Sequence, residues 1–334
     1  MLSIVIPIDL LRRPSNLLKR LKHIVCAARS SSFQVVVGHN DRGQIDDAKL
    51  KGLLKNEPSV TLVSKKFAFF ETSQAALRNL AVSSAKFETI LFLDADIYAD
   101  IELFQYLACR VAGGEPYAML PCLYLTPTGT RELLSRKIGM DIINGFFQFD
   151  RKKVLHLAMP SSIIAMKKED YFSLGGFNEA YKGHGYEDFD FMMRLIMKSS
   201  KVKAASEILI DKPYRAPLLS EGFRAVLAEK CIPHVLEKKF AFHLWHPRNG
   251  KESYYLRRSE NAKIFQGELR KCLDINYEME INSGVPFLIE PFFRACMEKG
   301  YKPTDFYALF HAAPSHQGRS KFSDWAAKIF CSFA

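Results

Sequence analysis

The hydrophobic and polar positions of the first hundred residues follow two alternating periods. Four short, nearly continuous apolar runs are typical of strands covered on both faces. They span residues 2–8, 33–39, 59–65 and 89–96. Residues 14–28 and 72–85 instead repeat apolar positions at helical spacing, and a further helical segment separates the second and third runs. Strands that alternate with helices predict a parallel, doubly wound sheet.

The rest of the chain is less regular. Residues 115–160 carry turn residues and aromatic side chains without a clear period, and we interpret them as an inserted region with a short strand and a loop. Residues 162–166 predict a strand, residues 167–174 a helix, and another helix begins near Glu187. Two basic helical segments follow, at residues 257–273 and 291–300.

The composition is that of a globular protein with a basic surplus. Of the 334 residues, 48% are apolar and 25% are charged, which is enough apolar material for a full core. The 47 basic and 36 acidic side chains give a net charge of +11. This charge favours a polyanionic partner: nucleic acid, an acidic membrane surface, an acidic polysaccharide or a phosphorylated small molecule.

The cysteines and the apolar runs bear on location. Seven scattered cysteines without a CxxC pair disfavour a zinc cluster or a disulfide framework and favour a reducing compartment. No apolar run reaches the about 18 residues of a membrane span, and the first residues lack the layout of a signal peptide. We expect a cytoplasmic protein. The basic, aromatic residues 320–334 leave open a peripheral contact at the inner face of the membrane, or a helix packed on the domain.

Two aspartates end the fourth predicted strand. Asp94 and Asp96 would share one face of a continuing strand, and carboxylates so close repel unless one is protonated or a cation lies between them. The carboxyl ends of parallel strands are also where ligands bind in such sheets. The pair therefore indicates a metal site, although a turn or helix cap is the other common use of such aspartates.

Two further groups carry candidate chemistry. Glu187 and Asp188 open a helix, where acids are ordinary because of the helix dipole, but a carboxylate held there can also act as a general base. His243 and His246 are three residues apart, a spacing at which two imidazoles converge on one cation from a helical turn or a tight loop. Structural or surface histidines are the alternative.

Four motifs in this order resemble the family-2-type glycosyltransferases of the GT-A fold. They also resemble the galactosyltransferase-like carboxyl half of chondroitin-polymerase-like enzymes. SIVIPI is similar to the opening strand, and AALRNLAVSSAKFETILFLDAD to the Arg-Asn helix followed by the DxD motif. GGFNEAYKGHGYEDFDF is similar to the GGFDE…GWGGED motif, and HLWHP to the late histidine motif. The resemblance covers residues 2–265.

The resemblance implies an α/β, Rossmann-like GT-A fold, with a mostly parallel central sheet flanked by helices. A GT-A domain would comprise residues 1–255, with a nucleotide-binding half at 1–100 and an acceptor-binding half at 101–255. A helical C-terminal extension would follow at residues 256–334.

The metal ligands are implied by the same motifs. Asp96 would bind Mn²⁺ or Mg²⁺, and Asp94 would contact the ribose or the metal. His246 would be the remote metal ligand and His243 a second one. Histidine nitrogen beside a carboxylate suits Mn²⁺ better than Mg²⁺, which prefers oxygen ligands.

The resemblance also assigns the donor side of the cleft. Pro7 and Asp9 would lie against the nucleobase, and Arg78 on the nucleotide side. The second strand usually ends in paired aspartates, but this sequence reads Gly-His-Asn-Asp at residues 38–41. Asp41 is a weak substitute, so the sequence leaves open which residues hold the nucleobase.

On the acceptor side, Asp188 would be the catalytic base and Glu187 would help to hold the acceptor. The acceptor-side mobile loop would consist of Gly183, His184, Gly185 and Tyr186. His184 replaces a common tryptophan of this loop and Tyr186 its last glycine, so we expect acceptor selection to differ from that of better-known members.

The implied function is an inverting, metal-dependent transfer from a nucleoside-diphosphate sugar, a UDP-hexose or UDP-N-acetylhexosamine. The acceptor would be a hydroxyl of a glycan or glycolipid in bacterial surface polysaccharide synthesis, of capsule or lipopolysaccharide. The alternative is a basic membrane-peripheral or nucleic-acid-binding protein without transferase activity. We expect no nucleic-acid partner, because the basic residues are spread along the chain rather than clustered.

Overall fold

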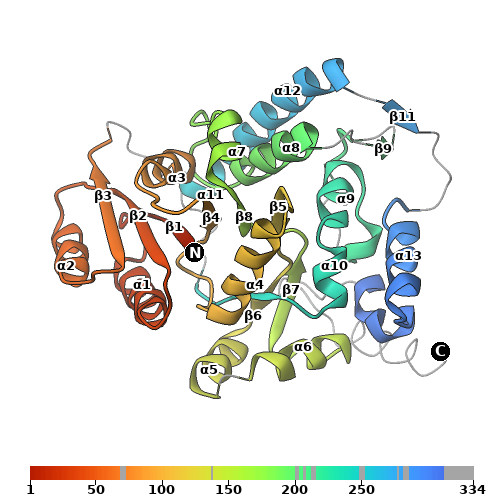
Figure 1. Cartoon of the computed structure of the whole chain (residues 1–334), viewed down its shortest axis with the longest axis horizontal. Coiled ribbons are helices and arrows are strands. Elements are labelled where there is room, and N and C mark those ends of the chain that lie inside the picture. The colour runs from red at the N-terminus through yellow and green to blue at the C-terminus, as the bar shows by residue number, and fades with distance from the viewer. Residues whose placement is uncertain are drawn as a thin grey trace.

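The computed structural model describes most of the chain. The described residues are 1–67, 73–136, 138–199, 203–205, 208–211, 216–247, 253–276, 278–280 and 286–311. A six-stranded sheet in the order β3-β2-β1-β4-β8-β5 forms its centre (Figure 1). Its strands are β1 (Leu2–Ile8), β2 (Gln34–Asn40), β3 (Val60–Lys65), β4 (Thr89–Phe92), β5 (Tyr117–Met119) and β8 (Ile164–Lys167).

The sheet is mostly parallel, as predicted. Strands β1 to β4 run parallel, while β8 runs antiparallel to both β4 and β5. All four apolar runs of the first hundred residues form strands. The fourth strand ends at Phe92, so Asp94 and Asp96 lie beyond its carboxyl end rather than inside it.

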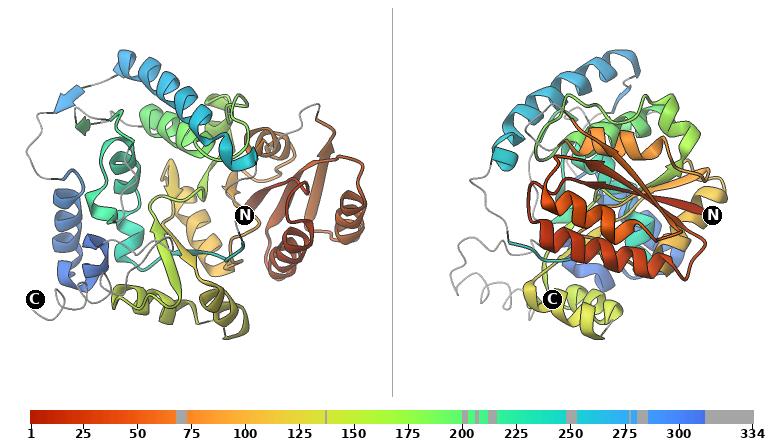
Figure 2. Two further views of the ribbon diagram at one scale, coloured as in Figure 1. Left: turned by 180° about the vertical axis from the view of Figure 1, so that it is seen from behind. Right: turned by 90° about the vertical axis from the view of Figure 1, so that its left-hand side faces the viewer.

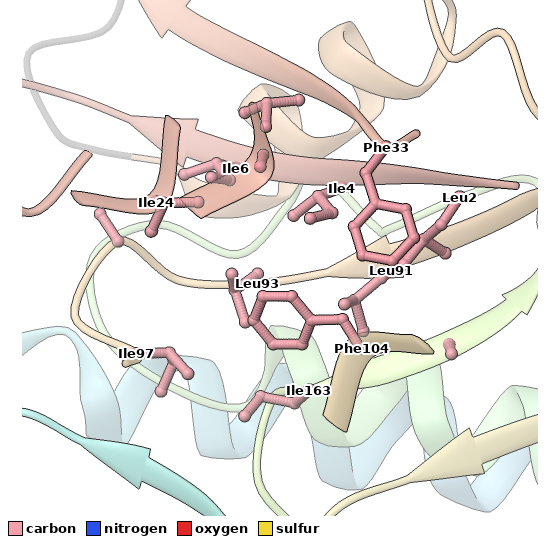
Figure 3. Packing of buried hydrophobic residues seen from close by; sticks show 14 of the residues in the cluster. Leu2, Ile4, Ile6, Ile24, Phe33, Leu91, Leu93, Ile97, Phe104 and Ile163 are labelled. Atoms are coloured by element: carbon pink, nitrogen blue, oxygen red, sulfur yellow. The ribbon is translucent and has the colours of Figure 1, made fainter. Parts of the chain in front are cut away.

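Helices cover both faces of the sheet (Figure 2). They include α1 (Pro14–Ala28), α2 (Ile45–Leu54), α3 (Gln74–Val82) and α4 (Ile101–Ala112). Alternate residues of β1 point to opposite faces, so Ile4 and Ile6 pack with α1, α2 and α4, as Figure 3 shows in part, whereas Val5 packs on the side of α3. Helix α1 has the predicted bounds, with Pro14 in its first turn, where the missing N–H costs nothing.

The stretch at 115–160 is more regular than we expected from its sequence. Besides β5 it contains β6 (Cys122–Leu125), α5 (Pro127–Arg136), α6 (Gly139–Phe147) and β7 (Val154–Ala158). The interpretation as a short strand and a loop was therefore incomplete. Gly129 in α5 and Gly145 in α6 lower the helix propensity of these segments and obscure the helical period.

A second, three-stranded sheet, in the order β10-β6-β7, adjoins the first. Its strand β10 (Ala241–His243) is joined to the chain just after β4 by the bridge between Ile97 and His243. This bridge brings the late histidine motif beside the two aspartates, although about 150 residues separate them in the sequence.

The remaining elements surround this frame. They are α7 (Lys168–Ser173), α8 (Glu187–Ser199), β9 (Lys203–Ala205), η1 (Pro217–Leu219), α9 (Gly222–Glu229), α10 (Ile232–Leu236), α11 (Ser253–Leu256), α12 (Arg258–Asn276), β11 (Glu278–Glu280), α13 (Ile289–Lys299) and η2 (Pro303–Phe310). Phe265 of α12 packs into the core beside α8, and Phe292 of α13 packs with Phe306. The described part of the predicted extension therefore shares the cores of the preceding residues.

The sequence expectation of a membrane contact concerns residues 320–334, which lie outside the described residues. Among the helices that the structure describes, none is both long and apolar enough to cross a membrane.

Candidate active site

A cleft of about 450 Å³ lies beyond the carboxyl ends of β1 and β4. It gathers most of the side chains that the sequence singled out. Those among its lining residues are Pro7, Asp9, Arg78, Asp94, Asp96, His184, Gly185, Tyr186, Glu187, Asp188, His243 and His246. Gly183 and Asp41 are not among the described residues that line it.

Arg78 joins two of the acids at the floor of the cleft. It comes from α3, is only 2% exposed, and donates from Nη2 to Asp94 Oδ1 over 2.9 Å. Its Nη1 lies 3.4 Å from Glu187 Oε1. Burial alone would lower the pKa of Arg78, but the charges of Asp94 and Glu187 outweigh burial and raise it. Arg78 thus offsets the repulsion between the two carboxylates.

Asp96 and the two histidines form a group with the donor set of a metal site. One ligand atom from each of Asp96, His243 and His246 lies within 4.8 Å of the others. His243 ends strand β10, and His246 follows in a segment that has neither helical nor turn structure. All three residues are less than 10% exposed.

The geometry between His246 and Asp96 fits a cation. His246 Nδ1 lies 3.0 Å from the carbonyl oxygen of Pro247, which can only accept, so this nitrogen carries the proton. Nε2 then presents a lone pair to Asp96 Oδ2, 3.5 Å away. Two ligand atoms about 2.2 Å from one cation lie about 3.1–3.6 Å apart at ordinary coordination angles. A divalent ion between the two atoms satisfies both.

Two arginines, one just before α1 and one within it, also contact Asp96. Arg13 Nη2 donates to Asp96 Oδ2 over 2.9 Å, and Arg20 Nη1 pairs with Oδ1. Burial by itself would raise the pKa of Asp96, but the hydrogen bond from Arg13 and the charges of both guanidinium groups lower it to about 2. Asp96 is therefore held ionised, as a metal ligand must be, and a cation would share its oxygens with these arginines.

Glu187 and Asp188 occupy the first turn of α8, as predicted. Oε2 of Glu187 is buried without a hydrogen-bond partner among the described residues. Asp188 Oδ1 accepts from the backbone N–H of Phe189 over 2.9 Å. Burial, opposed by Arg78, raises the pKa of both carboxyl groups, and for Glu187 the charge of Asp188 adds to the effect.

The loop before α8 adopts left-handed backbone conformations. Gly183 and Gly185 have φ angles of 69° and 90°, and Tyr186 has a φ of 77°. That value is strained for a residue with a side chain, whereas glycine adopts it freely. Tyr186 is held by a hydrogen bond from its hydroxyl to Asp211, and the guanidinium of Arg258 lies 4.8 Å from its ring. The predicted mobility of this loop stays a prediction.

On the side of the cleft where the sequence predicts the nucleotide, Asp9 is a lining residue and Asp41 is not. The carboxylate of Asp9 accepts from Asn40 Nδ2 over 3.1 Å and from two nitrogens of Arg42 over 3.0 and 2.8 Å. Burial raises the pKa of Asp9, but these bonds outweigh it and lower the pKa. Asp41 instead pairs with Lys51 of α2, outside the cleft, so the structure does not bring it to the site.

Sequence reasoning missed several side chains of the cleft. Arg13 follows the end of β1, and that position beyond a parallel strand was a usable signal. Ser162 donates to Asp94 Oδ2 over 2.9 Å. It precedes β8, which runs antiparallel to β4, so the rule for the carboxyl ends of parallel strands gave no signal for it. Tyr124 and His156, from β6 and β7, also line the cleft.

Comparison with known proteins adds the family. The description "Glycosyltransferase like family 2" belongs to the family that matches residues 4–271 of this sequence. No curated protein sequence matches the chain significantly.

Several solved structures are similar in part. TarS 1–349 from S. aureus, in complex with UDP-GlcNAc, is 13% identical with a TM-score of 0.41, over 89% of this chain and 72% of that one. The mannosyltransferase PcManGT from Pyrobaculum calidifontis, in complex with GDP-Man and Mn²⁺, is 13% identical with a TM-score of 0.40, over 99% and 79%.

The catalytic domain of Drosophila β1,4-galactosyltransferase 7, in complex with xylobiose, is 15% identical with a TM-score of 0.30, over 58% of this chain. The chain spans 59% of the length of that domain and, in a shorter alignment, 55% of TarS 1–349.

Proposed function

The chain belongs to the family Glycosyltransferase like family 2, and on this premise we propose that it catalyses an inverting, metal-dependent transfer from a nucleoside-diphosphate sugar. Family membership makes it a glycosyltransferase, so the alternative of a protein without transferase activity is dropped. One observation carries the proposal beyond the family. The carboxylate and imidazole groups of Asp96, His243 and His246 converge in the cleft that also contains Asp188.

The metal would be held by one oxygen of Asp96 and by ring nitrogens of His243 and His246. A divalent cation there supplies charge neutralisation for a departing diphosphate. The two nitrogen donors favour Mn²⁺ over Mg²⁺. Arg13, which already reaches Asp96, adds a positive charge on the same side of the cleft.

Asp188 is the proposed general base. It takes the proton from an acceptor hydroxyl while that oxygen forms a bond to the anomeric carbon of the donor. The bond from this carbon to the diphosphate oxygen breaks, and its electron pair leaves with the diphosphate. Attack from the face opposite the leaving group inverts the anomeric centre, so an α-linked donor gives a β-linked product.

The finer assignments extend the same proposal. Pro7 and Asp9 lie at the end of β1, where they would contact the base of a uridine diphosphate sugar, a UDP-hexose or UDP-N-acetylhexosamine. The acceptor would be a glycan or glycolipid of a bacterial surface polysaccharide. The six described cysteines are free thiols, which favours a reducing, cytoplasmic site of reaction.

A binding screen tests the proposal. We expect one or more UDP-sugars to raise the melting temperature of the protein in the presence of Mn²⁺, because a ligand that binds only the folded state stabilises it. Addition of EDTA should abolish the shift, and the same donor should release UDP when an acceptor is present. If no nucleoside-diphosphate sugar of any base shifts the melting temperature with Mn²⁺, the proposal is contradicted.

The raised pKa of Asp188 predicts the acidic limb of the pH profile. A general base works only when unprotonated, and a raised pKa means that Asp188 keeps its proton to a higher pH than the ordinary aspartate value of about 3.9. We expect kcat/KM to fall, as the pH is lowered, around a midpoint above that value. The measurement needs saturating Mn²⁺ at each pH, so that protonation of His243 and His246 does not contribute. A rate that stays constant down to about pH 4 would count against Asp188 as the base.

A further inference from the structure

Three flat rings lie in a row across the second sheet. In the strand registers His243 of β10 is paired with Tyr124 of β6, and Tyr124 is paired with His156 of β7. The rings of His243 and Tyr124 are stacked, with centroids 4.2 Å apart and planes at 13°. Those of Tyr124 and His156 are stacked in the same way, at 4.3 Å and 18°. The row is therefore a continuous ring stack with one ring from each strand.

The ring stack leads from the proposed metal site to the edge of the sheet. At one end, His243 lies 5.4 Å from His246 between ring centroids. At the other end, His156 is exposed on β7, the strand at the opposite edge of the sheet from β10. All three rings line the cleft. Figure 1 shows β6 and β7 on one side of β4 and β1 to β3 on the other. Asp9 directly follows the end of β1.

The chemistry of the ring stack differs from that of the rest of the cleft. Arginine and carboxylate side chains dominate near the proposed diphosphate position. The ring of Tyr124 is covered on both faces by His243 and His156, so the stack offers the outer face of His156, the hydroxyl and ring edge of Tyr124, and imidazole edges, all without a permanent charge. Aromatic faces carry partial negative charge and attract C–H groups, and hydroxyl and imidazole edges exchange hydrogen bonds. A pyranose ring presents both kinds of group, C–H on its faces and hydroxyls around its rim.

We propose that Tyr124 and His156 form the acceptor subsite and that the acceptor is a saccharide whose pyranose ring packs against the outer face of His156, beside the hydroxyl of Tyr124. The proposal rests on the proposed function, because the nucleotide and the diphosphate are assigned there to the sides of Asp9 and Asp96. The wall formed by β6 and β7 then remains for the sugar whose hydroxyl Asp188 deprotonates. Tyr124 and His156 bind and orient this sugar and take no part in proton transfer.

Saturation-transfer NMR with a panel of methyl pyranosides of glucose, galactose, mannose, N-acetylglucosamine and N-acetylgalactosamine tests the subsite. The protein is first saturated with UDP and Mn²⁺. We expect at least one glycoside to bind the wild-type protein, and His156→Ala to weaken that binding about 10-fold, a factor that corresponds to one good contact. Tyr124→Phe keeps the ring behind His243 and removes only the hydroxyl, so we expect a smaller loss, about 3-fold.

The controls separate the subsite from the proposed function. His23→Ala removes an exposed histidine of α1, outside the cleft, and should bind the glycoside like the wild type. Each variant should bind UDP with Mn²⁺ as the wild type does, which also reports that it is folded. A wild-type protein that fails to bind UDP with Mn²⁺ overturns the proposed function. If UDP binds but no glycoside does, or if both His156→Ala and Tyr124→Phe bind it unchanged, the subsite alone is wrong.

Discussion

Asp188→Asn is expected to lower kcat by about 10²–10⁴-fold, the usual contribution of a general base, while the protein stays folded. The amide has the shape of the carboxylate, and its oxygen can still accept the hydrogen bond from the N–H of Phe189. It cannot take a proton from the acceptor hydroxyl. Because Asp188 acts on the acceptor, we expect the affinity for the donor with Mn²⁺ to change little.

Steady-state kinetics with donor and acceptor, together with the melting temperature of each variant, check this result. Asp141→Asn is the matched control, because Asp141 also lies in the first turn of a helix, α6, but is exposed and is not among the cleft residues. Its kcat should equal that of the wild type. If Asp188→Asn keeps more than about a tenth of the wild-type kcat, another group removes the proton.

Asp96→Asn is expected to abolish measurable Mn²⁺ binding and, with it, sugar transfer. The substitution replaces a charged oxygen ligand with a neutral amide, while Arg13 and Arg20 remain beside the site and repel a cation. Mn²⁺ affinity is measured from the electron paramagnetic resonance signal of the free ion. Loss of a residue that only hydrogen-bonds to a metal ligand typically costs about 10–100-fold in affinity, and we expect a larger loss here.

Two other variants separate metal binding from stability. Asp96→Asn leaves two arginines without their charge partner, and we expect a lower melting temperature. His246→Ala leaves those ion pairs in place and should weaken Mn²⁺ binding with less effect on stability. Asp100→Asn alters the N-cap of α4, where asparagine serves as well as aspartate, and should leave both properties unchanged. Wild-type Mn²⁺ affinity in Asp96→Asn would rule out this carboxylate as a ligand.

The sequence predicted the frame of the fold where strands are buried on both faces. Short, continuous apolar runs such as residues 2–8 are typical of strands buried on both faces in an α/β domain, and β1 has those bounds. Residues 115–160 were misjudged in part because Gly139 begins α6 and Gly145 lies inside it, and glycine is a poor helix former. Helix α6 forms because Phe146 and Ile142 are buried by the surrounding residues, a tertiary effect that a local pattern does not contain.

The candidate site was predictable only as far as its motifs are local. Asp94, Asp96, Glu187 and Asp188 follow a strand or open a helix, and the cleft contains all four. The ion pair of Arg20 with Asp96 spans 76 residues, and no periodicity reveals such a pairing. The stack of Tyr124 and His156 depends on the register of two strands, which is set by the surrounding packing and not by the residues themselves.

The most direct test of the central claim is a crystal structure of the protein with UDP and Mn²⁺, recorded at a wavelength where manganese scatters anomalously. We predict one anomalous peak about 2.0–2.3 Å from a carboxylate oxygen of Asp96 and from Nε2 of His246, in contact with the diphosphate. Nucleotide bound in the cleft with no manganese between Asp96 and His246 would contradict it.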